Sequence, residues 1–284
     1  MINDRLNDLK LNREIFNIFA RLIREKCGLF FDLSKMYFLE TKLKKRMAER
    51  GITDFITYYN LLKNDYTDRE FKELLNEITI HETAFFRINS HFKTFSDYVL
   101  PGLVARKNDS GSLYLSFLSA GCSTGEEAYS IALSVFEKMK EFPQKIDFSV
   151  VGIDISISAI ERARNGIYSE NDLNSVPENI IEKYFEKVDN GFKVKDFVKE
   201  KVVFRYANLY KKEDIELIGR FDAVFCRYVL IYFDELAKTK LLDNIYSVLN
   251  PGGMLFVAPS ESYNVPENFA RINYKNSIVF EKPL

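Results

Sequence analysis

The stretch LYLSFLSAGCSTGEEAYSIALSVFEKM, residues 113–139, decides the fold class of this chain. Its first eight residues are mostly apolar and predict a buried strand. A turn bounded by Gly121 and Gly125 follows, and from residue 126 the apolar positions recur at helical spacing. The stretch therefore predicts a strand, a tight turn and a helix, which is the repeating unit of α/β sheets.

The turn itself indicates a ligand site. Gly121 and Gly125 allow the backbone to turn sharply, and the N–H groups at the start of the helix would face a ligand. The spacing G-x-x-x-G differs from the dinucleotide fingerprint, and Glu126 and Glu127 would repel a pyrophosphate. Carboxylates suit a cationic ligand without phosphate, such as S-adenosylmethionine with its sulfonium and ammonium groups. The alternative is a structural turn whose acidic residues favour the helix dipole.

A second acidic position strengthens the ligand interpretation. The next predicted strand ends in Gly152-Ile153-Asp154, about 30 residues after the turn. In sheets of this type an acidic side chain at that place can bind ribose hydroxyls. Asp154 could otherwise be only a helix cap, but the turn and the acid together favour a nucleoside-containing cofactor.

Further strand-like runs alternate with helical stretches after about residue 110 and predict a mostly parallel, seven-stranded sheet of the Rossmann-like type. The runs are DFSVVGID (147–154), FDAVFCRY (221–228) and GMLFVAPS (253–260). Residues 269–272 and 277–282, separated by Asn273 to Asn276, predict an antiparallel hairpin that closes the sheet edge.

An insertion at about residues 169–203 predicts a small β-subdomain. It contains a predicted helix, PENIIEKYFEKV (177–188), and two predicted strands, GFKV (191–194) and KVVFRY (201–206), near the turn Asp189-Asn190-Gly191.

The amino-terminal part predicts an all-helical domain. From Asn12 to Ile80 the apolar residues recur at helical spacing and indicate four helices of about 10 to 15 residues. The expected N-caps are Ser34, Thr53 and Asp68, and the expected helix ends are Gly28 and Gly51. We expect a helical domain over residues 1–85 and a second domain over 86–284.

Composition narrows the class of partner and compartment. The chain has 284 residues with 40 Lys and Arg against 41 Asp and Glu, so it has no overall basic field to attract nucleic acid. The three cysteines fit neither a disulfide framework nor a paired metal site. The polar start MINDRLNDLKLNRE and the lack of a long apolar run predict a cytoplasmic protein that does not insert into the membrane.

Five blocks in order and spacing resemble the CheR family of chemoreceptor glutamate O-methyltransferases over nearly the whole chain. They are ITIHETAFFR (78–87), LSAGCSTGEEAYSIAL (118–133), GIDISISAIERARNGIY (152–168), FDAVFCRYVLIYFD (221–234) and LNPGGMLFVAPSES (249–262). The resemblance implies the same division into a helical domain, a methyltransferase domain and an inserted β-subdomain. It implies transfer of a methyl group from S-adenosylmethionine to receptor glutamates, with S-adenosylhomocysteine as product and no metal.

The resemblance also implies which residues bind the cofactor. They are His81, Thr83, Arg87, Gly121, Glu126, Glu127, Asp154, Asn208, Leu209, Arg227 and Tyr228. The family usually has Asn in place of His81 and of Tyr228, so the chain departs from the pattern twice within the expected pocket.

Arg87 and Tyr232 are the candidate catalytic residues. A glutamate is already ionised at neutral pH, so positioning matters more than proton transfer. The Arg87 guanidinium can hold a carboxylate with two hydrogen bonds and leave a lone pair free. By resemblance Tyr232 lies on the opposite lip of the pocket. An interdomain salt bridge for Arg87 and simple packing for Tyr232 are the structural alternatives.

The candidate receptor-binding surface is basic. Residues 1–50 contain 12 Lys and Arg against 7 Asp and Glu, and Lys42, Lys45, Arg46 and Arg50 are predicted on the exposed side of one helix. The resemblance implies contact with the cytoplasmic helical domain of chemoreceptors, whereas a solvated face without a partner is the alternative. Because the turn at residues 189–191 is short, we expect no dependence on a tethering receptor pentapeptide.

Two other functions remain open at this stage, and we expect a monomer. The chain could methylate another protein or a small carboxylic acid with the same fold. It could also be a non-catalytic regulator that binds S-adenosylmethionine, a possibility motivated by His81 and Tyr228.

Overall fold

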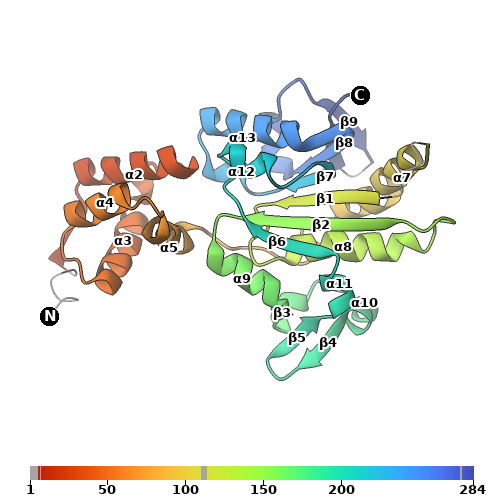
Figure 1. Cartoon of the computed structure of the whole chain (residues 1–284), viewed down its shortest axis with the longest axis horizontal. Helices are drawn as coiled ribbons and strands as arrows, with labels where there is room; N and C mark the ends of the chain where they lie inside the picture. The colour runs from red at the N-terminus through yellow and green to blue at the C-terminus, as the bar shows by residue number, and fades with distance from the viewer. Residues whose placement is uncertain (1–5, 7, 110–113, 276) are drawn as a thin grey trace.

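A seven-stranded sheet lies at the centre of this computed structural model, which describes residues 6, 8–109, 114–275 and 277–284. The strands are β1 (Tyr114–Ala120), β2 (Asp147–Asp154), β6 (Val202–Tyr206), β7 (Phe221–Cys226), β8 (Leu249–Val257), β9 (Ala270–Tyr274) and β10 (Ser277–Glu281). They pair in the order β6-β2-β1-β7-β8-β10-β9 (Figure 1). The first five are parallel, and β10 is antiparallel to β8 and to β9. The predicted sheet and its terminal hairpin are confirmed; the predicted turn of the hairpin includes residue 276, which lies outside the described residues.

The strand order makes β1 the switch point of the sheet. β1 pairs with β2 on one side and with β7 on the other, so the chain winds outward from β1 in both directions. The carboxyl ends of the parallel strands therefore meet at one edge, where doubly wound sheets bind their ligands.

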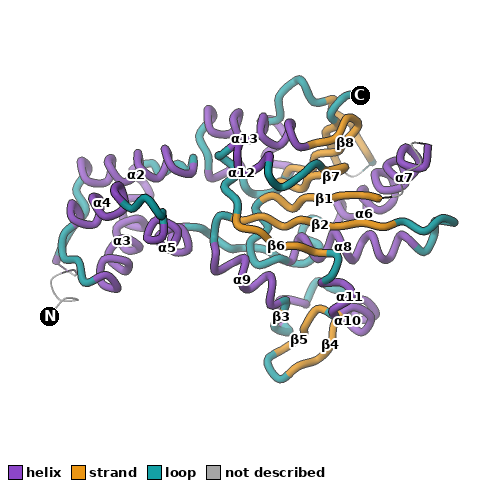
Figure 2. Tube along the Cα trace, in the orientation of Figure 1, coloured by secondary structure: helices purple, strands orange, loops and turns teal. Residues whose placement is uncertain are grey.

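Helices cover both faces of the sheet (Figure 2). Their bounds are α6 (Asn89–Thr94), α7 (Leu100–Asp109), α8 (Glu126–Met139), α9 (Ile157–Asn165), α12 (Lys212–Glu216) and α13 (Glu235–Val248), with a π-helical turn, η2 (Phe95–Val99), joining α6 to α7. Two apolar clusters follow from this arrangement. One joins α13 and the helical domain to the sheet, and the other joins α6, η2, α7 and α8 to the sheet.

The amino-terminal part contains the four predicted helices. They are α2 (Arg13–Cys27), α3 (Met36–Arg50), α4 (Phe55–Asn64) and α5 (Arg69–Ile78). Gly28 and Gly51 end α2 and α3 in the left-handed conformation, as predicted.

Two of the predicted N-caps are wrong by one or two residues. Asp54, not Thr53, caps α4 by accepting a hydrogen bond from the Thr57 N–H. Asp32, not Ser34, caps the short 3₁₀ turn η1 (Leu33–Lys35) that precedes α3. In both cases an aspartate lies one or two residues before or after the predicted hydroxyl residue, and its carboxylate accepts the hydrogen bond from the backbone N–H instead. Asp68 stands at the N-cap position of α5 but its side chain makes no capping hydrogen bond.

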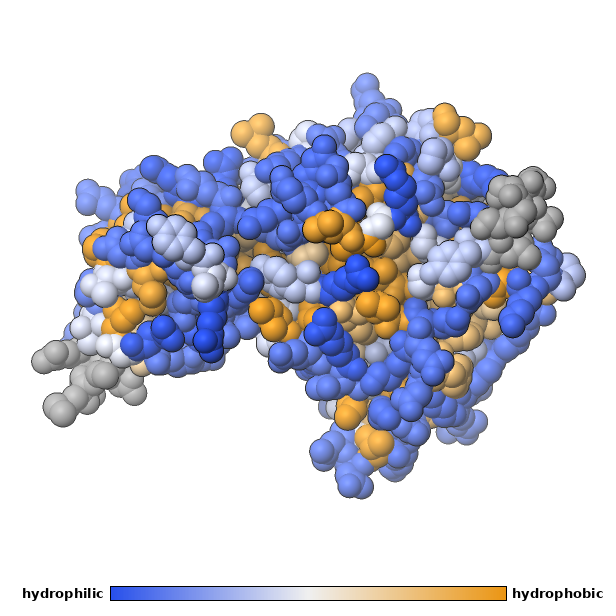
Figure 3. All heavy atoms as spheres, viewed as in Figure 1, coloured by the Kyte–Doolittle hydropathy of each residue, from blue (hydrophilic) through white to orange (hydrophobic). Residues whose placement is uncertain are grey.

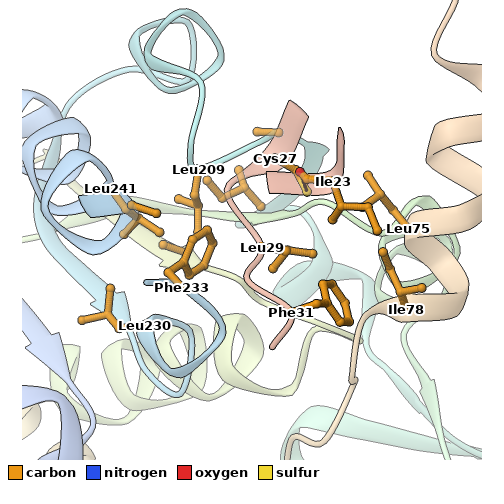
Figure 4. Close-up of a cluster of buried hydrophobic side chains, with 14 of the residues drawn as sticks. Ile23, Cys27, Leu29, Phe31, Leu75, Ile78, Leu209, Leu230, Phe233 and Leu241 are labelled. Atoms are coloured by element: carbon orange, nitrogen blue, oxygen red, sulfur yellow. Dashed lines mark hydrogen bonds between the residues drawn. The ribbon is translucent and has the colours of Figure 1, made fainter. Parts of the chain in front are cut away.

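The helical domain packs directly on the sheet domain. Figure 4 shows side chains from α2, α5 and the segment after α2 meeting side chains from beside β6 and β7 and from α13. They are Ile23, Cys27, Leu29, Phe31, Leu75, Ile78, Leu209, Leu230, Phe233 and Leu241. Since one apolar cluster spans both parts, their relative placement is fixed by burial of apolar surface. The predicted boundary between residues 85 and 86 stays a prediction.

The inserted region forms a second, three-stranded antiparallel sheet with the order β3-β5-β4. Its elements are β3 (Ile167–Tyr168), η3 (Asn171–Leu173), α10 (Glu178–Tyr184), β4 (Phe185–Val188), β5 (Gly191–Val194) and α11 (Asp196–Lys199). The prediction of GFKV as a strand is confirmed. The prediction that the helix extends to residue 188 is wrong, because residues 185–188 form β4. KVVFRY is a strand, but it is β6 of the central sheet, paired with β2.

The surface is mostly hydrophilic, with apolar atoms gathered over the strands in the view of Figure 3. Among the described residues, none of the helices has both the length and the apolarity needed to cross a bilayer. Cys27, Cys122 and Cys226 are buried free thiols.

Candidate active site

A cleft of about 450 Å³ opens at the carboxyl edge of the sheet. It is lined by residues that follow β1, β2, β6 and β7, together with residues of the helical domain and of the segment 78–87. The volume lies within the range of sites that enclose small molecules, about 300–1,000 Å³.

The turn after β1 has a backbone that glycine favours. Gly121 has a φ of 79°, and a Cβ there would lie 2.6 Å from Cγ2 of Val229. Gly125 has a φ of 101°, and a Cβ there would lie 2.9 Å from the Tyr168 hydroxyl. Both glycines are therefore required by conformation and by close packing. The predicted strand, turn and helix are present, with α8 beginning at Glu126.

The same turn leaves a polar atom without a partner. Ser123 lines the cleft, its Oγ is buried, and this atom makes no hydrogen bond within the described part of the chain. An unsatisfied buried hydroxyl is costly unless a ligand completes it. Ser123 thus fits a site that binds a polar molecule.

Glu127 is the buried carboxylate at the start of α8. One oxygen accepts a hydrogen bond from Ser119 Oγ at 2.7 Å, and the other accepts from Nε of Arg227 at 2.7 Å. The side chains of Glu127 and Arg227 are only 10% and 2% exposed. A buried ion pair of this kind is rigid, so the Glu127 carboxylate is held at one place in the cleft.

Asp154 ends β2 and faces His81 across the cleft. Its two oxygens accept hydrogen bonds from the backbone N–H groups of Ser123 and Ser156, each at 2.9 Å. Burial raises the pKa of Asp154, while these N–H groups and His81 oppose the rise. Burial lowers the pKa of His81, opposed by Asp154, so the imidazole is neutral at neutral pH.

The tautomer of His81 follows from its neighbour Thr79. The Thr79 hydroxyl donates to the Leu75 carbonyl at 2.7 Å and lies 3.1 Å from Nε2 of His81. Since that hydroxyl proton is already used, Nε2–H must be the donor and Nδ1 an acceptor. His81 lines the cleft, and its Nδ1 keeps an acceptor lone pair.

The Arg87 guanidinium contacts Glu82 along its edge and stacks on the Tyr228 ring with one face. Its Nη1 donates to the Glu82 carbonyl at 2.7 Å, and its Nη2 lies 3.2 Å from Oε1 of Glu82. Its guanidinium carbon lies 3.8 Å from the centre of the Tyr228 ring. Phe86 and Ile88, on either side, have φ values of 51° and 58°.

The loop after β7 is fixed by a buried carboxylate, Glu261, which is 1% exposed. Glu261 accepts hydrogen bonds from the N–H groups of Tyr228 at 2.8 Å and Ala258 at 3.1 Å. The loop carries Tyr232, whose pKa is raised by burial and by Glu82 and lowered by Arg87. The Tyr232 phenol is therefore neutral and able to donate a hydrogen bond at the lip of the cleft.

Asn208 fastens the two parts of the chain beside the cleft. Its Nδ2 donates to the Lys26 carbonyl in α2 at 2.9 Å, and its Oδ1 accepts from the Tyr210 N–H at 3.0 Å. A backbone hydrogen bond from Phe30 to the Tyr232 carbonyl, at 2.9 Å, adds a second tie.

Sequence comparisons match this chain to two profiles that together span most of it. Residues 81–278 match the profile described as "CheR methyltransferase, SAM binding domain", and residues 14–79 match "CheR methyltransferase, all-alpha domain". The chain belongs to the CheR methyltransferase family. It is 30% identical to "Chemotaxis protein methyltransferase 2" of Vibrio cholerae, over 98% of this chain and 96% of that protein.

Two further relatives carry the same kind of name. The chain is 32% identical to "Chemotaxis protein methyltransferase" of Escherichia coli, over 90% of this chain and 87% of the relative. It is 29% identical to the protein of that name from Borreliella burgdorferi, over 93% and 94%. Membership of the family supports S-adenosylmethionine as the methyl donor.

Most of the predicted site residues of this CheR protein meet in the one cleft. Those that line it are His81, Thr83, Arg87, Gly121, Glu127, Asp154, Asn208, Leu209, Arg227, Tyr228 and Tyr232. Glu126 does not line it, since its buried carboxylate accepts from the Thr124 hydroxyl at 2.7 and 2.8 Å. Ten of these residues were predicted to contact the cofactor and Tyr232 to act in catalysis, and both roles stay predictions.

The predicted basic surface needs a correction. Arg46 is only 8% exposed, because its Nε and Nη2 both donate to the Glu70 carboxylate at 3.0 Å. The prediction that Arg46 lies on the exposed side of α3 is wrong. Lys42 and Lys45 both pair with Glu77, at 3.6 and 2.7 Å, and Arg50 lies 3.5 Å from Glu70.

The helical domain contributes lining residues that the sequence did not indicate. They are Phe30, Phe31, Ser34, Lys35 and Phe38. The rings of Phe31 and Phe38 stack 6.4 Å apart, with the Lys35 ammonium 5.7 Å from the Phe31 ring. Glu261 was missed as well; its place in the block LNPGGMLFVAPSES was the only signal for it.

Proposed function

We propose that this CheR protein methylates glutamate side chains on bacterial chemoreceptors in the cytoplasm, with S-adenosylmethionine as the methyl donor. Family membership and the names of the relatives support the reaction class. The observation that carries the proposal is that two acidic residues and an arginine line the same cleft. Glu127 and Asp154 suit a cationic nucleoside, and Arg87 suits a carboxylate.

The residues present fit the cofactor. Asp154, with lone pairs left beyond its two backbone contacts, suits the ribose hydroxyls, and Glu127 suits the ammonium group. The unpartnered Ser123 Oγ and the lone pair of His81 supply further polar contacts. When bound, S-adenosylmethionine supplies a methyl group on a positively charged sulfur.

The chain's own contribution is to aim and desolvate the substrate carboxylate. A glutamate with an ordinary pKa of about 4.3 is already ionised at neutral pH, so no general base is needed. Arg87 holds one carboxylate oxygen while the other stays free, and Tyr232 donates to the same group from the opposite lip. The apolar lining from Phe31 and Phe38 excludes water, which strengthens both contacts.

The mouth of the cleft fits a protein substrate. Phe30, Ile80 and Ile231 line the cleft and are 41%, 56% and 52% exposed. Exposed apolar residues around a mouth are typical of a surface that a partner covers. We propose that a receptor helix covers them, with Lys45 and Arg50 attracting its acidic side chains.

We propose further that the enzyme does not depend on a receptor pentapeptide. The connection between β4 and β5 is short, with Val188 paired directly to Gly191. Titration of a receptor carboxy-terminal pentapeptide should therefore give no heat. Saturable binding would refute this part of the proposal and leave the rest intact.

Calorimetry with S-adenosylhomocysteine tests the cofactor site first. We expect micromolar binding to the wild type and at least about tenfold weaker binding to Asp154→Ala, since the ribose contact is lost. Asp147→Ala is the matched control, because Asp147 begins the same strand and lies outside the cleft.

Transfer of a radiolabelled methyl group to purified receptor fragments tests the reaction. Base-labile label on glutamates is the expected result. Binding of S-adenosylhomocysteine without transfer to any receptor would refute the proposal and favour a ligand-binding regulator. Transfer only to another protein or to a small acid would support the methyl-transfer reaction but refute chemoreceptors as the substrate.

A further inference from the structure

The contact between Arg87 and Tyr228 points to a role beyond cofactor binding. The guanidinium carbon lies 3.8 Å from the centre of the Tyr228 ring, well inside the roughly 6 Å reach of a cation–π contact. We propose that Tyr228 is a positioning residue, which fixes the plane of the Arg87 guanidinium so that its edge meets the substrate carboxylate. The inference rests on the proposed function, in which Arg87 holds that carboxylate.

The position of the Tyr228 ring is set by its backbone. Tyr228 has a φ of 58°, a left-handed conformation that is strained for a residue with a Cβ. Its N–H donates to the buried Glu261 carboxylate at 2.8 Å. Strain that the surroundings hold in place is a feature of functional sites.

The backbone of Arg87, like that of Tyr228, is held by hydrogen bonds to buried side chains. Arg227 donates from Nη1 to the Arg87 carbonyl at 2.5 Å, and Arg227 is itself bound to Glu127. Phe86, one residue earlier, has a φ of 51° and donates its N–H to Ser130 Oγ at 2.9 Å. Because the Arg87 backbone and the Tyr228 ring are both fixed, stacking on the ring sets the plane of the Arg87 guanidinium.

The edge of that plane can accept a carboxylate. A stacked ring occupies the face of a guanidinium, whereas its five N–H groups lie in the plane. Glu82 already uses this edge through its carbonyl and its carboxylate. The Glu82 side chain is 79% exposed, so this ion pair is weak and a substrate carboxylate can displace it.

If Tyr228 positions Arg87, its aromatic ring and not its hydroxyl should determine kcat. A cofactor contact through the phenol would instead depend on the hydroxyl, so the two roles can be separated. Tyr228→Leu removes the π face and keeps a Cβ, so backbone strain is similar to that of the wild type. Tyr228→Phe keeps the face. Tyr263→Leu is the matched control, because Tyr263 is 78% exposed and lies outside the cleft.

The assay measures kcat and KM for a receptor fragment at saturating S-adenosylmethionine, with S-adenosylhomocysteine affinity from calorimetry. We expect Tyr228→Leu to lower kcat by about 3- to 30-fold, the range of a desolvated cation–π contact. KM for the receptor fragment should change by less than about twofold, because the misaimed carboxylate affects the transition state most. Saturating S-adenosylmethionine keeps any loss of cofactor affinity, which calorimetry reports separately, out of kcat. Tyr228→Phe should restore most of the kcat.

A double-mutant cycle with Arg87→Ala completes the test. If Tyr228 acts through Arg87, Tyr228→Leu should have no further effect on kcat in the Arg87→Ala background. Equal effects in both backgrounds, or a loss of kcat in Tyr228→Phe as large as that in Tyr228→Leu, would refute the inference. Absence of transfer by the wild type would refute the proposed function and this inference with it, whereas wild-type transfer with full activity in Tyr228→Leu would refute the inference alone.

Discussion

Breaking the buried pair of Glu127 and Arg227 should destabilise the whole domain. Their side chains are 10% and 2% exposed, and Nε lies 2.7 Å from Oε2. Arg227→Met leaves a buried carboxylate without its cation, which costs about 3–5 kcal/mol. With an unfolding entropy of about 2.1 cal/mol/K for each of the 284 residues, the melting temperature should fall by about 5–8 °C.

The reciprocal variant and the double variant separate charge from packing. Glu127→Gln alone leaves Arg227 unpaired and should also destabilise the fold. Glu127→Gln with Arg227→Met removes both charges, so we expect a loss at least about 1 kcal/mol smaller than the sum of the single losses. The double variant should bind S-adenosylhomocysteine more weakly than the wild type does, because the Glu127 carboxylate that suits the ligand's ammonium group is gone.

Calorimetric unfolding scans with ligand titrations measure both quantities. Lys212→Met is the control, since Lys212 pairs with Glu216 at 3.5 Å on the surface and should change stability by under about 0.5 kcal/mol. Additive losses in the double variant would show that the two side chains are not coupled. Wild-type ligand affinity in Glu127→Gln would remove Glu127 from the cofactor site.

Two further predictions concern stability. His91 is 2% exposed, and burial, with Arg227, lowers its pKa from 6.5 to about 4. Between pH 6.5 and pH 4 the unfolded chain therefore binds a proton at His91 that the native state does not, so this residue should lower stability by about 3 kcal/mol as the pH drops. In denaturant titrations, His91→Phe should lose less stability than the wild type over this pH range, by about that amount. Gly121→Ala should cost about 1–2 kcal/mol from its φ of 79° and more from the contact with Val229. In thermal unfolding, the double variant Gly121→Ala with Val229→Ala should recover the stability lost to the close contact but not the stability lost to backbone strain. Wild-type stability of Gly121→Ala would contradict the strain argument.

The sequence predicts the sheet and much of the site because their signals are local. An apolar strand followed at once by glycine or an acid identifies a carboxyl end, and parallel strands bring such ends to one edge. Gly121 and Asp154 could therefore be placed in one cleft without knowledge of any contact. The resemblance added Arg87 and Tyr232, which local patterns do not connect with the turn.

Two of the failures, the placement of KVVFRY and that of Arg46, have a different physical origin, which is pairing between distant residues. KVVFRY has the pattern of a strand, but only its pairing with β2, about 50 residues earlier, decides which sheet it joins. Arg46 has the spacing of an exposed helical position, but Glu70 on α5 binds it and buries it. A hydrophobic period reports which side of a helix is apolar and cannot report a charged partner on another helix.

The same reasoning explains why the helical side of the cleft was missed. Phe31 and Phe38 look like ordinary core residues in sequence, and they line the cleft only because the helical domain is docked on the sheet domain. That docking depends on the shared apolar cluster and on the hydrogen bond from Asn208 to the Lys26 carbonyl. These ties lie beside the cleft and hold its two walls together, so in the function proposed above the receptor helix would bring its glutamate to Arg87.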